Sequence, residues 1–390
     1  VSSPTNCLES PLPYAILLLV ADDLTGAADC AAYAPGLGLP AQIHVGALPM
    51  LFSQGLHAFS TNSRALAPAA SAAAMRRALI LWPNYPGDRC FKKIDSLLRG
   101  NVGAEVEAML AGLRLQKALI CPALPAQGRS VVAGQLVGAS APIDIAHVVA
   151  AQTTLPLAVL APESARGPRS ILVKALAAAA ADAHLIIADA QTDADLDALV
   201  AAWRKAVPDG LLCGSAGLAA AWLRARRPKT MRPPRVAAGT PPIDLVVIGS
   251  ASEMAHAQID VAAALPGVQA IELRPDSLLE SAPGARIILH LPRLERAPSP
   301  AASAAATSAL ARAACTLANE LPAHHLLVAG GDMAQALLPH LGVARLHVLE
   351  ARAPGMPTCR AGRYAGPPLW ITLKAGNHGS PDTLAMLMQP

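Results

Sequence analysis

The stretch that decides the fold is "ILLLVADDLTGAADCAAYA", residues 16–34. Five aliphatic residues in a row, Ile16 to Val20, are typical of a buried strand. Asp22 and Asp23 end that strand, and the helix-prone segment "TGAADCAAYA" follows them. A buried strand that turns directly into a helix indicates a βαβ unit, and α/β proteins bind their ligands at such strand ends.

The same alternation of strand and helix continues along the chain. Further strands are predicted at "QIHVG", "LHAFS", "RCFKKI", "KALICPAL", "HLIIAD", "DLVVIGS", "ARIILHL", "HHLLVAGG", "RLHVLE" and "LWITLKAG". The alanine tract at 175–184 is predicted to be a packed helix. The segment 226–242 contains five prolines and no apolar period, which indicates a linker. The prediction is therefore α/β, with two domains (1–225 and 244–390) joined by a linker at 226–243, each a mainly parallel sheet flanked by helices.

Composition excludes several functional classes. The chain has 390 residues, 53% of them apolar, and a formal charge of +4 without a run of like charges, so a nucleic-acid partner is not expected. The apolar run at 14–21 is too short to span a bilayer, and no membrane association is predicted. Seven widely spaced cysteines without a CxxC pair indicate reduced thiols and a cytoplasmic protein.

Three strand ends of the first domain carry groups suited to a small, anionic, hydroxylated ligand. Asp22 and Asp23 could orient a substrate hydroxyl, take its proton or bind Mg²⁺, although one aspartate alone would serve as a helix N-cap. Arg64, in "STNSRAL", could grip a carboxylate with its planar fork, or could equally be a surface residue after a capped helix start. In "FKKIDSLLRGN" (91–101), Lys93 and Asp95 share one face and Arg99 follows the turn. The loop "CPALPAQGRSVVAGQ" (121–135) contains a further cluster of hydrogen-bond donors, Gln127 and Arg129.

Glycine-rich turns mark the second domain. "VIGSAS" (247–252), "VAGGD" (328–332) and "LKAGNHGS" (373–380) each follow a predicted strand, and Lys374 stands beside the last turn. Bare backbone N–H groups at such turns bind phosphate oxygens. The chain lacks both GxxxxGK[ST] and GxGxxG, so a nucleotide site here would be built by neither of those loops.

Six motifs, in order, resemble the four-carbon acid sugar kinase family. They are "ADDLTGA" (21–27), "FKKIDSLLRGN" (91–101), "PALPAQGR" (122–129), "GSAGLA" (214–219), "GGD" (330–332) and "KAGNHG" (374–379). The resemblance runs from about residue 15 to the C-terminus. It implies transfer of phosphate from ATP, with Mg²⁺, to the 4-hydroxyl of D-threonate, D-erythronate or a 3-oxo-tetronate. It also implies an N-terminal acid-sugar domain, a C-terminal nucleotide domain and an active site in the cleft between them.

The resemblance also implies roles for particular residues. Asp22 or Asp23 would be catalytic, and which of the two is the base stays open. The substrate residues would be Asp23, Arg64, Lys93, Ile94, Asp95, Ser96 and Arg99. The nucleotide residues would be Ser250, Ser252, Gly330, Gly331, Asp332, Met333, Gly376 and Asn377. The metal ligands are not assigned.

This chain departs from the family pattern at several positions. The family has a hydroxyl residue where Leu97 stands and near Met333, an acidic residue at Ser60, and phenylalanine at His378. Two alternatives therefore remain open: a weakened or non-catalytic effector-like protein with the same fold, and a nicotinamide-dependent oxidoreductase. A homo-oligomer is also possible on this sequence.

Overall fold

We describe a computed structural model of the chain. The described residues are 16–46, 53–80, 82–161, 168–227, 240–274, 284–293, 299–321, 324–363 and 369–389. Most of the predicted linker (226–243) and Cys7 lie outside these residues.

The first half of the chain alternates strands and helices. Its strands in the main sheet are β1 (Ile16–Ala21), β2 (Ala41–His44), β3 (Gly55–Ser60), β4 (Cys90–Lys93), β5 (Ala118–Cys121), β9 (Leu157–Val159), β10 (Leu185–Ile187) and β11 (Leu211–Gly214). Its helices are α1 (Leu24–Ala31), α2 (Pro68–Ala78), α3 (Val102–Leu113), α4 (Ile145–Ala150), α6 (Arg169–Asp182), α7 (Asp193–Ala206) and α8 (Ala216–Arg224). Three short strands, β6 (Ser130–Val132), β7 (Gln135–Val137) and β8 (Ile143–Asp144), form a separate small sheet.

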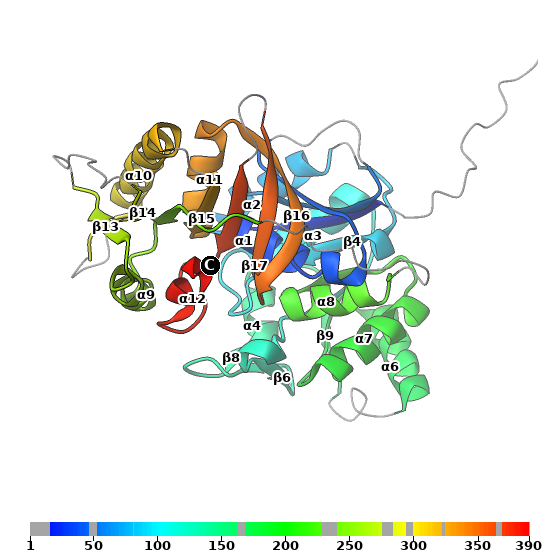
Figure 1. Ribbon diagram of the computed structural model, residues 1–390. Coiled ribbons are helices and arrows are strands. Elements are labelled where there is room, and N and C mark those ends of the chain that lie inside the picture. The colour runs from blue at the N-terminus through cyan, green and yellow to red at the C-terminus, as the bar shows by residue number, and fades with distance from the viewer. Residues whose placement is uncertain are drawn as a thin grey trace, which may run out of the picture.

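The second half adds a similar series that ends in a hairpin and a last parallel strand. Its strands are β12 (Leu245–Ile248), β13 (Val268–Glu272), β14 (Arg286–His290), β15 (His325–Ala329), β16 (Val343–Ala353), β17 (Met356–Arg363) and β18 (Trp370–Lys374). Its helices are α9 (Glu253–Ala263), α10 (Pro300–Glu320), α11 (Gly331–His340) and α12 (Thr383–Met388). Figure 1 shows α9 and α10 on one side of the β16–β17 hairpin and α6, α7 and α8 on the other.

Both halves contribute to one continuous sheet of 15 strands. Its order is β13-β14-β12-β15-β18-β17-β16-β2-β3-β1-β4-β11-β5-β10-β9. Pairing is parallel within each series, and three antiparallel steps, β18–β17, β17–β16 and β16–β2, join them. Those three steps reverse the strand direction, and the twist that accumulates along a sheet turns one half relative to the other. The α/β prediction is confirmed, and the hairpin that joins the halves is an addition to it.

The strand that opens the fold is buried almost throughout. Leu17 to Ala21 of β1 are buried, as a central parallel strand covered by helices on both faces requires. The prediction that this run is a buried strand rather than a membrane span is confirmed. Within the described residues, no helix is both long and apolar enough to cross a membrane.

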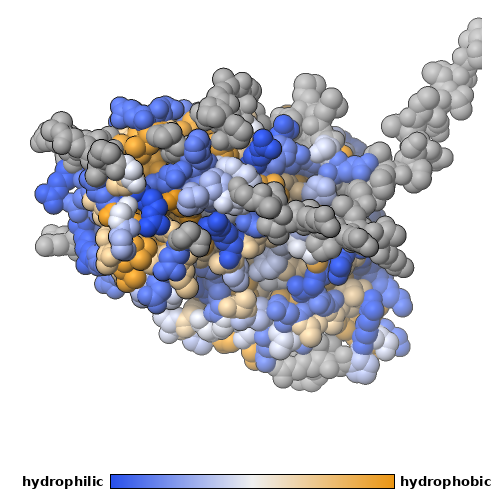
Figure 2. All heavy atoms as spheres, in the orientation of Figure 1, coloured by the Kyte–Doolittle hydropathy of each residue, from blue (hydrophilic) through white to orange (hydrophobic). Residues whose placement is uncertain are grey.

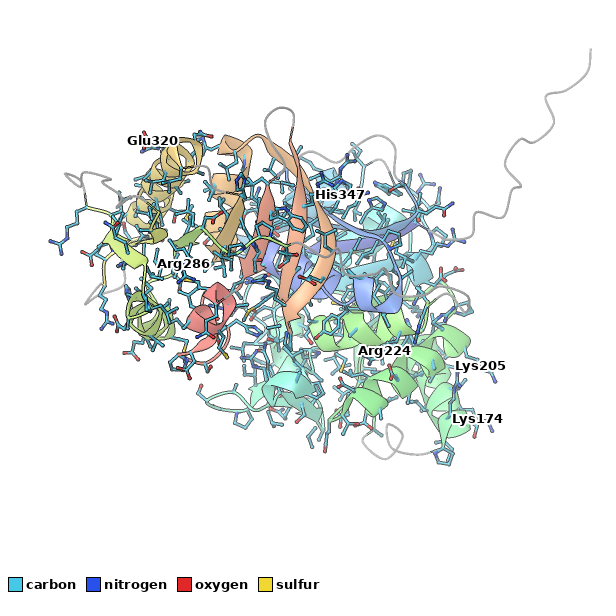
Figure 3. All side chains as sticks on the ribbon, viewed as in Figure 1. Lys174, Lys205, Arg224, Arg286, Glu320 and His347 are labelled. Carbon is cyan, nitrogen blue, oxygen red and sulfur yellow. The ribbon has the colours of Figure 1, made fainter. Side chains whose placement is uncertain are left out.

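The surface in the same orientation mixes hydrophilic and apolar residues, with hydrophilic residues bordering α6 and α7 (Figure 2). Lys174 of α6 and Lys205 of α7 lie at the outer edge of the molecule (Figure 3). Lys92, Lys93 and Lys374 are buried instead. Because burying an ammonium group is costly, each of these three lysines needs a partner or a function.

Candidate functional site

A cavity of about 420 Å³ lies where the two halves meet, a volume in the usual range for small-molecule sites. The first half supplies strand-end and loop residues, and the second half supplies the β16–β17 turn and the segment after β18. The lining residues are Asp23, Thr25, Gly26, Asp29, Arg64, Lys93, Asp95, Ser96, Leu97, Arg99, Leu124, Ala126, Gln127, Arg129, Gly355, Ala375, Asn377, His378 and Gly379.

Asp22 and Arg64 form a two-point ion pair at the ends of neighbouring strands. Because β1 and β3 pair in parallel, their carboxyl ends lie side by side. Arg64 Nε and Nη2 donate to Asp22 Oδ2 and Oδ1 at 2.7 and 2.9 Å. Burial would raise the pKa of Asp22, but the Arg64 hydrogen bonds and the charges of Lys92, Arg64 and Lys93 lower it below 3.8. Asp22 does not line the cavity.

Asp23 serves as the N-cap of α1 and lines the cavity as well. Its Oδ1 accepts from Gly26 N at 2.9 Å and from Arg64 Nη2 at 2.8 Å, and its Oδ2 accepts from the Thr25 hydroxyl at 2.5 Å. The N-cap role is therefore shown for Asp23, and its chemical role stays a prediction. Gly26 is required here, since a Cβ would lie 2.5 Å from Asp23 Oδ1.

The two adjacent lysines of β4 point to opposite faces of the sheet. Lys92 Nζ lies 2.7 Å from Glu105 Oε2 of α3, and both side chains are buried. Glu105 also accepts hydroxyl hydrogen bonds from Ser63 and Ser71 at 2.5 Å. Lys93 lines the cavity. Burial would lower its pKa, but the nearby Cys30, Asp22, Asp23 and Asp29 raise it. Lys92 is thus structural, while Lys93 faces the site.

The turn after β4 is held by Asp95. This carboxylate accepts from Arg99 Nε at 2.9 Å and Nη2 at 2.7 Å, and from the backbone N–H of Leu97 at 3.0 Å. Burial would raise the pKa of Asp95, but the Arg99 hydrogen bonds and nearby cations lower it. Ile94, in contrast, is a core residue that does not reach the cavity, and its carbonyl accepts from Lys93 Nζ at 2.8 Å.

Arg129 is the lining arginine without an acidic partner among the described residues. Its Nη1 donates to Ser96 Oγ at 2.5 Å and to Gln127 Oε1 at 2.8 Å. Burial lowers the pKa of Arg129 below 12.5. Arg64 and Arg99 are both paired with aspartates, so Arg129 is left with the charge best placed to meet an anionic ligand.

The three glycine-rich turns of the second half lie together, because β12, β15 and β18 are neighbours in parallel. Gly330 N donates to the carbonyl of Lys374 at 2.9 Å. A Cβ on Gly376 would lie 2.7 Å from Ser250 Cβ, and one on Gly249 would lie 2.8 Å from Met333 Cβ. Each of the three turns follows a strand, as predicted, and the strand order brings the turns together.

The turn that begins α11 also touches the first half. A Cβ on Gly331 would lie 2.9 Å from Asp23 Oδ2. The N-termini of α1 and α11 therefore face each other across the junction of the two halves. Gly330 has φ of +110°, a conformation that glycine adopts readily and other residues avoid.

The predicted nucleotide residues differ in their surroundings. Asn377 lines the cavity, Ser252 caps α9, and Asp332 is exposed in the first turn of α11. Met333 is 1% exposed and packs against Gly249, so its side chain belongs to the core rather than to a phosphate surface. Its backbone N–H still lies in the first turn of α11.

Lys374 is a buried cation at the end of β18. It is 2% exposed, and its Nζ donates to the carbonyls of Ala375 and Gly376 at 3.1 Å each. Burial lowers the pKa of Lys374 to about 8. Among the described residues no carboxylate pairs with it, so an anion close to these turns would satisfy its charge.

Comparison with known proteins decides the family. Residues 17–222 match the "Sugar-binding N-terminal domain" and residues 245–384 match the "Nucleotide-binding C-terminal domain". The chain belongs to the four-carbon acid sugar kinase family. The predicted domain limits, 1–225 and 244–390, stay a prediction.

Relatives of this family match nearly the whole chain. The chain is 30% identical over 412 residues to a D-threonate kinase of Cupriavidus necator, covering 94% of this chain and 96% of that protein. It is 29% identical over 421 residues to a 3-oxo-tetronate kinase of the same organism, covering 94% and 95%. The crystal structure of Haemophilus influenzae protein HI1011 shares the fold, with a TM-score of 0.69, 21% identity and coverage of 96% and 99%.

Several residues at this acid sugar kinase site were absent from the predicted set. Thr25, Asp29, Gln127, Arg129, Lys374 and His378 all lie in or beside the cavity. Gln127, Arg129 and Lys374 were visible as donors after predicted strands, and the family motifs include them. Asp29 had no such signal, because it lies within the helix and its exposure to the cavity depends on the second half of the chain.

Proposed function

We propose that the protein is an ATP-dependent kinase that phosphorylates the 4-hydroxyl of a four-carbon sugar acid, namely D-threonate, D-erythronate or a 3-oxo-tetronate. The observation that supports this most directly is a cavity lined by residues of both the sugar-binding and the nucleotide-binding domain. A phosphoryl transfer between two bound substrates needs them held in line, and such a junction can hold both.

The charges of the cavity suit an acid sugar on the side of the first half. We assign the substrate carboxylate to Arg129, assisted by Lys93, because Arg129 has no acidic partner among the described residues. Arg64 was expected to hold the carboxylate, and its Nε–H and Nη2–H groups are directed to Asp22 and Asp23. Its direct contact with substrate stays a prediction. Asp95, Ser96 and Arg99 would shape the same end of the site.

The turns of the second half suit the phosphates of ATP. Backbone N–H groups at 250–251, 331–333 and 375–377, with the α11 N-terminus and Lys374, would bind the phosphate oxygens. Mg²⁺ at kinase sites is held by phosphate oxygens and one or two carboxylates. Among the described residues, no group of three or more His, Cys, Asp or Glu side chains is placed to hold a metal. We therefore propose that Mg²⁺ binds together with ATP.

The test is ADP release, measured by a coupled assay, with ATP–Mg²⁺ and each isomer of threonate, erythronate and 3-oxo-tetronate. Rapid ADP release with one acid, and a product whose phosphate is on the 4-oxygen by ³¹P NMR, is the expected result. Binding of ADP and acid without turnover would instead favour a non-catalytic protein with this fold. Thermal stabilisation by NADH but not by ADP–Mg²⁺ would favour the oxidoreductase.

The cellular setting is part of the proposal. The six described cysteines are free, which supports a reducing compartment such as the cytoplasm. Association into a homo-oligomer stays a prediction, to be measured by light scattering.

A further inference from the structure

The N-cap of α1 and two residues within the helix face the cavity at helical spacing. Asp23, Gly26 and Asp29 lie at i, i+3 and i+6, and all three line it. The absence of a side chain at Gly26 leaves room for the Lys93 ammonium, since a Cβ there would lie 3.2 Å from Lys93 Nζ. One face of α1 therefore presents two carboxylates to the site, with a lysine beside them.

Asp29 lies where the second half closes over this helix. A Cβ on Gly355, in the β16–β17 turn, would lie 2.7 Å from Asp29 Oδ1 and 3.2 Å from His378 Cε1. Gly355 has φ of +73°, so both its conformation and the space beside it favour glycine. The Asp29 carboxylate therefore lies beside Gly355, as does the His378 ring, and both of these residues belong to the nucleotide-binding domain.

The three aspartates of α1 and its N-terminus differ in how their oxygens are used. Asp22 accepts two hydrogen bonds from Arg64, and Asp23 accepts three hydrogen bonds in all. Within the described residues, no hydrogen bond or ion pair engages the carboxylate of Asp29. A carboxylate that is already neutralised by a guanidinium is a weak base, whereas a carboxylate without donors keeps its lone pairs available.

The electrostatic surroundings of Asp29 also favour a carboxylate that can accept a proton. Burial is the largest cause that raises the pKa of Asp29, to about 6, with Asp23 adding to the rise and Lys93 opposing it. The titratable groups that face it are Lys93 of β4, Asp23, Cys30 and Tyr33 around α1, and His378 after β18. The pKa of His378 is lowered by burial, then by Lys374 and Arg129, so its imidazole is neutral near pH 7. A general base works best when its pKa lies near the working pH.

We propose that Asp29 is the general base of the reaction, accepting the proton of the sugar-acid hydroxyl that attacks ATP. The inference rests on the proposed kinase function. As the hydroxyl oxygen bonds to the γ-phosphorus, the bond from that phosphorus to the bridging oxygen breaks and ADP leaves. The hydroxyl proton passes to an Asp29 oxygen and then to solvent. Asp22 and Asp23 hold Arg64 and the start of α1 in place.

The test compares Asp29→Asn with Asp22→Asn, Asp23→Asn and the wild type. Asp182→Asn is the matched control, because Asp182 is exposed in the last turn of α6 and far from the cavity in the fold. Steady-state kinetics with ATP and the best acid substrate are measured from pH 5 to 9. Calorimetry gives the affinities for ADP and for the acid, and circular dichroism checks the fold.

For Asp29→Asn we expect kcat to fall by about 100-fold or more while both affinities change by less than about threefold. Because only ionised Asp29 can accept a proton, wild-type kcat/KM should rise with pH through about 6. The residual activity of Asp29→Asn should lack that rise. Asp182→Asn should match the wild type in every measurement.

Other results would overturn the assignment. Folded Asp29→Asn enzyme with kcat within tenfold of the wild type would exclude Asp29 as the base. Weakened acid affinity with unchanged kcat would make it a binding residue. Loss of turnover in His378→Phe but not in Asp29→Asn would transfer the role to His378. A wild-type protein that releases no ADP with any four-carbon acid would overturn the kinase proposal itself, and the base with it.

Discussion

Arg64 and Asp22, 42 positions apart in sequence, are joined by two hydrogen bonds of 2.7 and 2.9 Å. The side chain of Asp22 is 4% exposed and that of Arg64 is 24% exposed. The same guanidinium reaches Asp23 at 2.8 Å, so one residue after β3 fixes both carboxylates after β1. The orientation of the α1 N-terminus, and with it the cavity-facing side of α1, depends on this pair.

Removing Arg64 should destabilise the protein. Arg64→Ala leaves the Asp22 carboxylate buried without its partner, which should cost about 3 kcal/mol in the free energy of unfolding. Arg64→Lys should cost about 1 kcal/mol, because an ammonium cannot donate to both oxygens in one plane. Urea unfolding at pH 7 measures both. Equal unfolding free energies of the wild type and both variants would show that the Arg64–Asp22 pair makes no net contribution to stability.

The same pair should shape the response to acid. The folded-state pKa of Asp22 is lowered, so its stabilising contribution is present above about pH 4 and is lost as pH falls through the folded value. In Arg64→Ala, the drop in unfolding free energy between pH 5 and 3 should therefore be smaller than in the wild type.

Lys92 and Lys93 should separate stability from catalysis. Lys92→Met leaves Glu105, 2% exposed, without its cation and should cost about 3 kcal/mol or more in unfolding free energy. The enzyme that remains folded should keep kcat/KM within a few-fold. Lys93→Ala should lose about 2 kcal/mol or more of transition-state stabilisation toward the acid, since Lys93 faces the cavity. Lys117→Met is a control for charge removal. A loss of activity in Lys92→Met and a loss of stability in Lys93→Ala would mean that the structural and the cavity-facing lysine were assigned the wrong way round.

The strands at the centre of each half were predictable because local patterns determine them. The aliphatic run at 16–20 became β1, and all but the last two residues of the alanine tract lie in α6. The link between the halves was not predictable, because β16 pairs with β2 across about 300 residues, as in Arg345 with His44. Nothing local in either strand records its partner.

The direction in which a side chain points could not be predicted from the sequence either. Adjacent lysines at 92 and 93 look alike in a motif, and only the position of α3 decides that Lys92 pairs with Glu105. Ile94 belongs to the core although it lies inside the motif "FKKIDSLLRGN". Met333 follows a phosphate-type turn, yet Gly249 leaves a space that its side chain fills.

The burial of Met333 changes the expected effect of restoring a hydroxyl. A threonine hydroxyl at position 333 that reached a phosphate would add about 0.5–1.5 kcal/mol to ATP binding. Its packing against Gly249 instead predicts unchanged ATP affinity and a loss of about 1–3 kcal/mol in unfolding free energy from the space left behind. Calorimetry with ADP and urea unfolding distinguish these two outcomes.

Arg129 should determine affinity for the acid. Arg129→Ala should lower kcat/KM for the acid, with a loss of about 2 kcal/mol of transition-state stabilisation, because the carboxylate loses a charge-assisted contact. The KM for ATP should change little. The kcat/KM of Arg129→Lys should lie between the values for the wild type and Arg129→Ala, since lysine keeps the charge but lacks the planar fork. Arg312→Ala, on the exposed side of α10, is the control. Unchanged kcat/KM in Arg129→Ala would move the carboxylate to Arg64 or Arg99.

Lys374 should make nucleotide binding depend on pH. Its pKa is about 8 because burial disfavours the charged form, and phosphate oxygens bind the charged form. ADP affinity should therefore weaken as pH rises from 7 to 9. Between about pH 8 and 10.5 the unfolded chain binds more protons at this lysine than the folded chain does, so the lysine makes the free protein more stable as pH rises.

Lys374→Met tests both halves of that argument. It should weaken ADP binding by about tenfold or more at pH 7, remove the decline toward pH 9, and raise the melting temperature of the free protein at pH 7, because a buried charge is gone. Lys205→Met, at the outer edge of α7 (Figure 3), is the control and should change neither property. Calorimetry with ADP–Mg²⁺ across this pH range, beside thermal unfolding of both variants, gives the answer. Wild-type ADP affinity in folded Lys374→Met would show that this lysine does not bind the phosphates. The proposed phosphate site would then rest on the glycine-rich turns alone.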